Sequence, residues 1–204
     1  MSLQPFTVVT AKAAPMLAAN IDTDVIMPKQ FLKGIDRSGL DRGLFFDLRF
    51  LPNGEPDPDF VLNQPAWQGA GFMVVGPNFG CGSSREHAVW GLKQMGIRAL
   101  IGSRFAGIFY DNCQRNGVLL ITLEEAVLQR LGQTISQPEH AQISVDLAQQ
   151  EIRLADGQVI AFQIDTLRKT ALLLGLDAIG STLQRRDEIK SFEHRHLQAN
   201  PWLN

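Results

Sequence analysis

The chain has 204 residues, of which 45% are hydrophobic and 20% are charged, so it lies outside the composition of disordered proteins and can bury a core. A formal net charge of -2 supplies no basic surface for a nucleic-acid backbone, and no apolar run is long enough to cross a bilayer. We therefore expect a single domain over residues 1–204 of a cytoplasmic protein that binds neither nucleic acid nor membrane.

The N-terminal part is predicted to alternate between short elements and loops. The pattern indicates a strand at residues 6–10, a polar loop at 20–24 and a short helix after Pro28. Residues 33–65 contain four glycines and four prolines. Such a stretch is expected to be loop-rich and to serve function or partner contact more than the core.

The middle of the chain predicts a β-α-β-α-β unit. A continuous apolar strand at 71–76 is followed by a helix that residues 83–86 open, with a serine at the cap position, and that runs to about residue 95. A strand at 99–101, a helix at 105–115 and a strand at 118–121 follow. This order predicts an α/β fold of three layers with a largely parallel sheet and right-handed crossovers.

The remaining sequence predicts a helix to about residue 131, short strands at 143–147, 151–154 and 159–164, and a helical tail from about residue 165. Asp156-Gly157 between the last two strands is a hairpin turn signal.

The two cysteines, Cys81 and Cys113, match neither a disulfide framework nor a paired metal-ligand spacing, so we expect free thiols. Two thiolates are too few for a cubane iron–sulfur cluster. We therefore expect this chain to bind no metal or cluster alone, and any such cofactor to come from a partner. Cys113 lies on the helix predicted at 105–115, where a packing role is expected.

The strongest local signal for chemistry is the string GCGSSREHA at residues 80–88, between a buried strand and a helix start. A helix N-terminus offers unpaired N–H groups and a partial positive charge, and glycines allow a ligand close to the backbone, so an anion fits there. Arg85 is able to bind a carboxylate through two hydrogen bonds, and the same donors would stabilise an alkoxide at Ser83. On spacing alone, helix capping is the commoner role for these serines.

Four segments resemble, in order and separation, the swivelling domain of the aconitase superfamily, whose fold is a three-layer β/β/α arrangement. They are GCGSSREHA, NIDTDVIMPKQFL at 20–32, GIRALIGSRFAGIFYDNCQRNGVLLI at 96–121 and FQIDTLRKTALLLGLDAIGSTLQ at 162–184. The last segment is similar to the tail of the bacterial isopropylmalate dehydratase small subunits. The resemblance covers nearly the entire chain.

The resemblance implies a hydro-lyase that interconverts 2-isopropylmalate and 3-isopropylmalate through isopropylmaleate in leucine biosynthesis. It implies activity only with a large subunit, whose [4Fe-4S] cluster acts as a Lewis acid. Ser83 is implied as the catalytic base, and Ser84 and Arg85 as ligands of the substrate carboxylate. Cys81 stands where aconitases have an acidic residue, a departure that the isopropylmalate branch shares. A structural role for Cys81, as a small residue in a tight turn, is at least as good an interpretation as a chemical role.

The loop after Phe31 is where members of this family are thought to read the variable part of the substrate. Leu32 and Ile35 are candidates for an apolar pocket around an isopropyl group. Such a pocket would reject a substrate with a charged carboxymethyl group in that place, because burying a charge is costly. Arg37 is a candidate ligand of a substrate carboxylate. Core packing for the two apolar residues and a solvated charge for Arg37 are equal alternatives.

Three more polar residues invite a functional interpretation. Asp22 and Asp24 are expected to cap the local backbone and not to bind a metal. His87 is expected to be structural and not a proton shuttle.

Two other functions remain open. A sister hydro-lyase acting on homoaconitate, citraconate or dimethylmaleate would differ in the loop at residues 33–40. A non-catalytic module that binds an anion at Ser83–Arg85 would have no cluster-bearing partner. The subunit stoichiometry is open as well.

Overall fold

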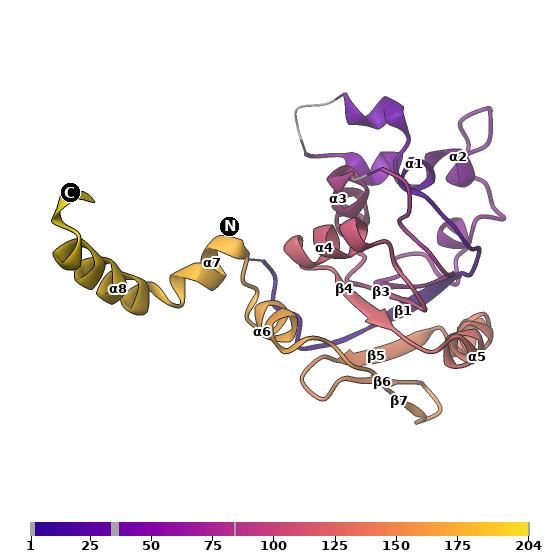
Figure 1. The fold of residues 1–204 in the computed structure, drawn as a ribbon. Helices are drawn as coiled ribbons and strands as arrows, with labels where there is room; N and C mark the ends of the chain where they lie inside the picture. Colours follow the sequence, from indigo (N-terminus) through magenta and orange to yellow (C-terminus); the bar gives the residue numbers. More distant parts are fainter. Residues whose placement is uncertain (1–2, 34–36, 84, 204) are drawn as a thin grey trace.

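The computed structural model describes residues 3–33, 37–83 and 85–203. These residues form a seven-stranded sheet in the order β4-β3-β2-β1-β5-β6-β7, with helices on both sides (Figure 1). The strands are β1 (Val8–Met16), β2 (Phe72–Val75), β3 (Ala99–Gly102), β4 (Leu119–Thr122), β5 (Gln142–Asp146), β6 (Glu151–Arg153) and β7 (Val159–Ala161).

The sheet has a parallel half and an antiparallel half that meet at β1. Strands β1 to β4 pair in parallel, whereas β5, β6 and β7 continue from β1 in antiparallel order. The predicted α/β fold is confirmed, and the parallel pairing covers the β-α-β-α-β unit. The hairpin predicted at Asp156-Gly157 joins β6 to β7, and Gly157 has the positive φ of 88° that such a turn requires.

The first strand is longer than predicted. It was expected at residues 6–10, but β1 runs to Met16, because its first half pairs with β5 and its second half, from Ala13, pairs with β2. Alanine has a low strand propensity, which hides this half in the sequence. Ala13 and Ala14 are fully buried at the centre of the sheet, where only tertiary packing identifies them as strand residues.

The helices divide between the two faces of the sheet. The side chains of β2 alternate, so that Met73 and Val75 pack with α3 and α4, whereas Phe72 and Val74 pack with α5. All four are fully buried, which confirms the prediction of a strand covered on both faces. The helices are α1 (Thr23–Ile26), α2 (Phe46–Arg49), α3 (Glu86–Gln94), α4 (Gly107–Arg115), α5 (Glu125–Ile135), α6 (Thr166–Leu174), α7 (Ala178–Leu183) and α8 (Arg186–Ala199).

The segment at 33–65 is loop-rich as predicted, but it also contributes to the core, contrary to expectation. Leu44 and Phe45 are fully buried, and Leu40 and Phe60 nearly so. The ring of Phe45 lies 5.8 Å from that of Phe60, centroid to centroid. Short helical turns with isolated apolar residues give no clear period in the sequence, so the composition concealed this packing.

The tail from residue 165 is helical, as predicted, and its last two helices stand away from the rest of the molecule (Figure 1). Neither α7 nor α8 contains a buried residue. No helix in the part of the chain that the structure describes is long and apolar enough to cross a membrane.

Candidate functional site

The candidate site lies where two loops meet at one edge of the sheet. Strands β1 and β2 are parallel neighbours, so the loops that follow their carboxyl ends emerge side by side. In open α/β sheets this edge is the usual place for a ligand. The two loops are residues 20–24 and 77–85, which carry two of the segments on which the family resemblance rests.

Hydrogen bonds tie these two loops together. The amide of Gly80 donates to the carbonyl of Ile21, and the amide of Thr23 donates to the carbonyl of Cys81, both at 2.8 Å. The hydroxyl of Thr23, which is 1% exposed, donates to the carbonyl of Ser83 at 2.8 Å. The backbone at Ser83 is therefore held at a fixed position relative to the loop at 20–24.

The turn before Ser83 requires glycine at position 80. Gly80 has a φ of 78°, and a Cβ atom there would lie 2.2 Å from the ring of Phe109 on α4. Gly82 has a φ of 91°. Side chains other than glycine are strained at such angles, so these two residues set the path that brings Ser83 to the surface.

The predicted serine cap on α3 is wrong. The helix begins at Glu86 with Arg85 at the N-cap position, and no side chain caps it. The turn at Gly82 places Ser83 ahead of the cap position, where its side chain is exposed. Among the described residues, no hydrogen bond involves the hydroxyl of Ser83, so this group is open to a ligand. Ser84, the second predicted substrate ligand here, lies outside the described residues.

Arg85 has a carboxylate partner that the sequence did not reveal. Its side chain is only 15% exposed and forms an ion pair with Asp24, through Nη1 and Oδ1. Asp22 is the N-cap of α1 and accepts from the amide of Val25 at 2.8 Å. The expectation of two backbone caps is thus confirmed for Asp22 and wrong for Asp24. The two partners are 61 residues apart, and sequence spacing gives no signal for their contact.

Two of the three predicted substrate-reading residues, Leu32 and Arg37, lie in the described part of the chain. Leu32 ends a 3₁₀ turn and is half-buried against the core. Arg37 is exposed, with its guanidinium carbon 4.2 Å from the centre of the Trp90 ring. Ile35 lies outside the described residues. The structure thus places Arg37 against the middle of α3, beyond the turn that carries Ser83.

Gln94 fixes this loop to α3, a role that the sequence analysis missed. Its amide nitrogen donates to the carbonyl of Arg37, and its oxygen accepts from the amide of Leu40 at 2.7 Å. Trp90 donates to Asn116 at 3.0 Å, and Asn116 donates to Glu86 at 2.8 Å. Side chains of α3 thus bind Asn116 near the start of the helix and the loop at 37–40 near its end. A pocket of about 390 Å³ is lined by Arg37, Trp90, Lys93, Gln94 and Asn116.

The thiols do not form a ligand set for a metal cluster. Cys81 is partly exposed in the site, whereas Cys113 is fully buried on α4, and burial raises the pKa of its thiol. The packing role expected for Cys113 is confirmed. No group of three or more histidine, cysteine or acidic side chains that could hold a metal occurs in the described ranges. His87 packs on Trp90, with ring centroids 4.7 Å apart.

Family models match the chain at different segments. Residues 3–126 match the aconitase C-terminal domain, and residues 179–204 match the C-terminal domain of 3-isopropylmalate dehydratase small subunits. The chain is 62% identical to 3-isopropylmalate dehydratase small subunit 1 of Mannheimia succiniciproducens, over 98% of the chain and 99% of that protein. It is 50% identical to the 3-isopropylmalate dehydratase small subunit of Rhodospirillum rubrum, over 98% and 97%.

A solved structure has the same fold. The crystal structure of 3-isopropylmalate dehydratase from Methanocaldococcus jannaschii superposes with a TM-score of 0.66 at 26% sequence identity. The match covers 92% of this chain and 99% of that one. The two proteins therefore share their overall fold over most of both chains.

Proposed function

The chain belongs to the 3-isopropylmalate dehydratase small subunits, within the wider family of the aconitase C-terminal domain, and from this premise we propose its reaction and site. It is the small subunit of a heteromeric hydro-lyase that interconverts 2-isopropylmalate and 3-isopropylmalate through isopropylmaleate, in leucine biosynthesis in the cytoplasm. The observation that carries the proposal is the junction of the loops at 20–24 and 77–83, which holds the backbone of Ser83 in place and leaves this residue exposed, two positions before Arg85.

Ser83 acts as the base. It removes a proton from the substrate carbon next to a carboxylate, while the hydroxyl group leaves from the neighbouring carbon. A serine hydroxyl needs a stabilised alkoxide for this role. The N-terminus of α3 begins three residues after Ser83 and supplies a partial positive charge, and the guanidinium of Arg85, two residues after Ser83, would supply a further cation.

Arg85 and Ser84 hold the carboxylate. Asp24 contacts Arg85 through Nη1, which leaves Nε and Nη2 of the guanidinium for a bidentate bond to the substrate. The ion pair also restricts the rotation of the Arg85 side chain, so the donors are oriented before substrate arrives. Asp24 is thus a positioning residue, and Arg85 binds the substrate itself.

The loop at 32–40 reads the variable substituent. Leu32 and Ile35 contribute apolar surface for an isopropyl group, and Arg37 contributes a cation for the second carboxylate. Support comes from the half-buried position of Leu32 and from the exposed guanidinium of Arg37 on Trp90.

The site is completed by the large subunit. The exposure of Ser83 supports an arrangement in which this chain forms one wall of the site and the large subunit encloses the substrate. The thiols of this chain do not fit a [4Fe-4S] cluster, and the proposal assigns that cluster, with its Lewis-acid chemistry, to the large subunit.

Reconstitution tests the proposal. The chain is mixed with the cluster-loaded large subunit, and isopropylmaleate is followed by its ultraviolet absorbance, with each chain alone as a control. Turnover is expected only in the mixture. A stable complex without turnover of isopropylmalate would point to a sister substrate, homoaconitate, citraconate or dimethylmaleate. Failure to form a complex would favour a non-catalytic anion-binding module.

A matched pair of variants tests the base. Ser83→Ala is expected to lower kcat by about 100-fold or more without changing the affinity for the large subunit. Ser144→Ala, on β5 in the antiparallel half of the sheet, is the control and should retain wild-type kcat. Near-normal turnover in Ser83→Ala would remove Ser83 from the mechanism.

A further inference from the structure

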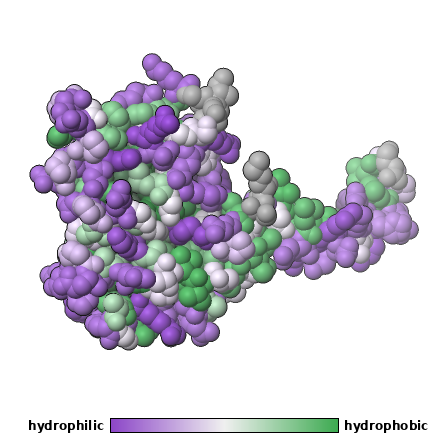
Figure 2. Space-filling model, turned by 180° about the vertical axis from the view of Figure 1, so that it is seen from behind, coloured by the Kyte–Doolittle hydropathy of each residue, from purple (hydrophilic) through white to green (hydrophobic). Residues whose placement is uncertain are grey.

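Two tryptophans of this chain reach the surface in different settings. Trp202 is 75% exposed in the C-terminal arm, residues 176–203, which stands apart from the body in Figure 2, with hydrophobic side chains beside hydrophilic ones. Within the described ranges, no aromatic ring or cation packs on Trp202. Trp90 on α3 is half-buried and contacts a guanidinium, an imidazole and an amide. Of the two, only Trp90 has neighbours whose orientation it can set.

The indole of Trp90 lies against the guanidinium of Arg37. The guanidinium carbon is 4.2 Å from the centre of the ring. The face of a tryptophan ring attracts a cation, so this contact restricts the positions open to a long and otherwise mobile side chain. Arg37 is exposed, and no carboxylate among the described residues forms an ion pair with it. Its hydrogen-bond donors are therefore oriented by Trp90 and not consumed by a partner in that part of the chain.

The indole is itself held in place by Asn116, which follows α4. The indole N–H donates to Oδ1 of Asn116 at 3.0 Å. The amide nitrogen of Asn116 donates to Oε1 of Glu86 and to the carbonyl of Asn112, both at 2.8 Å. An indole can only donate and a carbonyl can only accept, so these three bonds allow the amide a single orientation. The ring that carries Arg37 is thus fixed by a fully bonded side chain.

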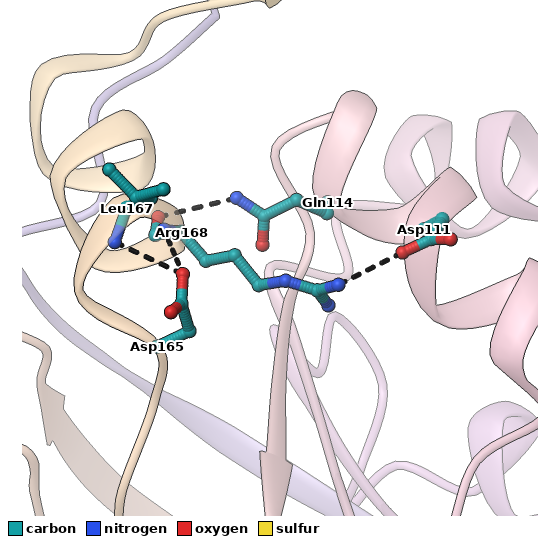
Figure 3. Close-up of polar contacts among 5 residues, drawn as sticks. All are labelled: Asp111, Gln114, Asp165, Leu167 and Arg168. Carbon is teal, nitrogen blue, oxygen red and sulfur yellow. Dashed lines mark hydrogen bonds and ion pairs between the residues drawn. The ribbon is translucent and has the colours of Figure 1, made fainter.

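Helix α4, which leads to Asn116, is held against α6 on its other side (Figure 3). Arg168 on α6 pairs with Asp111 at 3.1 Å, and Gln114 donates to the carbonyl of Arg168 at 3.2 Å. Asp165 caps α6 at its start. The support of the indole therefore extends through α4 to a second helix.

The backbone of Arg37 is restrained as well. Gln94, one turn after Trp90 on α3, accepts from the amide of Leu40 at 2.7 Å and donates to the carbonyl of Arg37. The loop is thus bound at its backbone by one side chain of α3 and at its guanidinium by another. Arg37 is therefore restrained at both ends before any ligand arrives.

The space beside this pair suits an anion. The pocket of about 390 Å³ described above has two cationic side chains in its lining, Arg37 and Lys93, and no acidic one. Its other lining groups are the indole and two side-chain amides. A carboxylate would meet positive charge there without a competing negative group.

We propose that Trp90 is a positioning residue for substrate binding, which, held by Asn116, orders the guanidinium of Arg37 for a substrate carboxylate. This inference rests on the proposed function, because the role of Arg37 comes from there. Trp90 acts through Arg37 and not on the reacting atoms, so its loss should weaken substrate binding and leave the chemical step at Ser83 unchanged. The alternative is that the ring only packs α3 against the core.

A double-mutant cycle tests the inference. Trp90→Leu, Arg37→Gln and the double variant are each combined with a saturating concentration of the cluster-loaded large subunit, and kcat and KM for isopropylmalate are measured. We expect Trp90→Leu to raise KM about two- to fivefold with kcat unchanged, the effect of one exposed cation–π contact. In the Arg37→Gln background the same change should raise KM no further, because the residue through which it acts is gone.

Two more variants complete the design. Trp90→Phe keeps an aromatic face but loses the N–H that Asn116 holds, so its KM should lie between those of wild type and Trp90→Leu. Trp202→Leu makes the same substitution in the arm and is the matched control. It should leave both KM and kcat at wild-type values.

The outcomes separate this inference from the proposed function. An equal rise of KM in the wild-type and Arg37→Gln backgrounds would show that Trp90 acts independently of Arg37, and the inference would be wrong while the proposed function stands. Wild-type KM in Trp90→Leu, or a fall in kcat in place of the rise in KM, would overturn it in the same way. If Arg37→Gln leaves KM unchanged, Arg37 is no substrate ligand and the inference falls with that part of the proposed function. If the wild-type mixture does not turn over isopropylmalate, both fall.

Discussion

Replacing Gly80 by alanine is expected to damage the site from within the fold. Two separate costs act at this position. The φ of 78° is unfavourable for any residue with a Cβ atom, and that atom would lie 2.2 Å from Cγ of Phe109. Phe109 is 3% exposed and packs edge-on against Phe79 at 5.7 Å, so its ring has little room to retreat.

The magnitude follows from these two terms. Placing alanine in the left-handed region costs about 1 kcal/mol. Overpacking a closed core position adds about 1–3 kcal/mol. The free energy of unfolding should therefore fall by about 2–4 kcal/mol, and the displaced turn should also lower turnover in the reconstituted enzyme, because Ser83 follows three residues later.

Gly157→Ala supplies the control for the first term. Gly157 has a φ of 88°, but a Cβ atom there would have no neighbour within 4 Å. Urea unfolding, followed by tryptophan fluorescence, should show a loss of about 1 kcal/mol for this variant. An equal loss in the two variants would refute the contact with Phe109. Adding Phe109→Leu to Gly80→Ala should recover part of the loss if the ring is its cause.

Three further predictions concern other parts of the chain. Asp24→Asn removes the charge that orients Arg85, and kcat/KM should fall about tenfold in the reconstituted enzyme, since a hydrogen bond to a charged group contributes about 1.5–3 kcal/mol; a rise would mean that Asp24 competes with substrate. Gln94→Leu deprives the amide of Leu40 of its acceptor, so hydrogen exchange at that amide should accelerate, and unchanged protection would contradict the clamp. Burial raises the pKa of the Cys113 thiol above its ordinary 9.0, so the unfolded state releases this proton first and stability falls as the pH rises past that value. Cys113→Ala should weaken the alkaline loss of unfolding free energy in urea titrations, and an identical pH slope would exclude the thiol as its source.

Much of the fold was predictable because it depends on local patterns. Neighbouring residues alone predict three of its features. These are the apolar run that forms β2, the helices before and after β3 in the chain, and the turn at Asp156-Gly157. The strings at 20–32 and 80–88 likewise predicted two segments whose loops the structure brings together at the candidate site. The family resemblance, not the spacing, assigned the chemistry to Ser83.

The errors occurred where distant segments decide the structure. Strand pairing extended β1 through alanines that have little strand propensity, and core packing buried Leu44 and Phe45 in a stretch with a loop-like composition. The helix cap depended on the path that Gly82 imposes on the chain.

The sequence by itself determined the order of the main strands and helices, the buried strands, and which residues bring charge and hydroxyl groups to the candidate site. Tertiary structure alone decided that Asp24 meets Arg85, that Thr23 holds the carbonyl of Ser83, and that Gln94 fixes the loop at Arg37. The physical reason is the parallel pairing of β1 with β2, which brings together loops some 60 residues apart, and no local pattern encodes that distance.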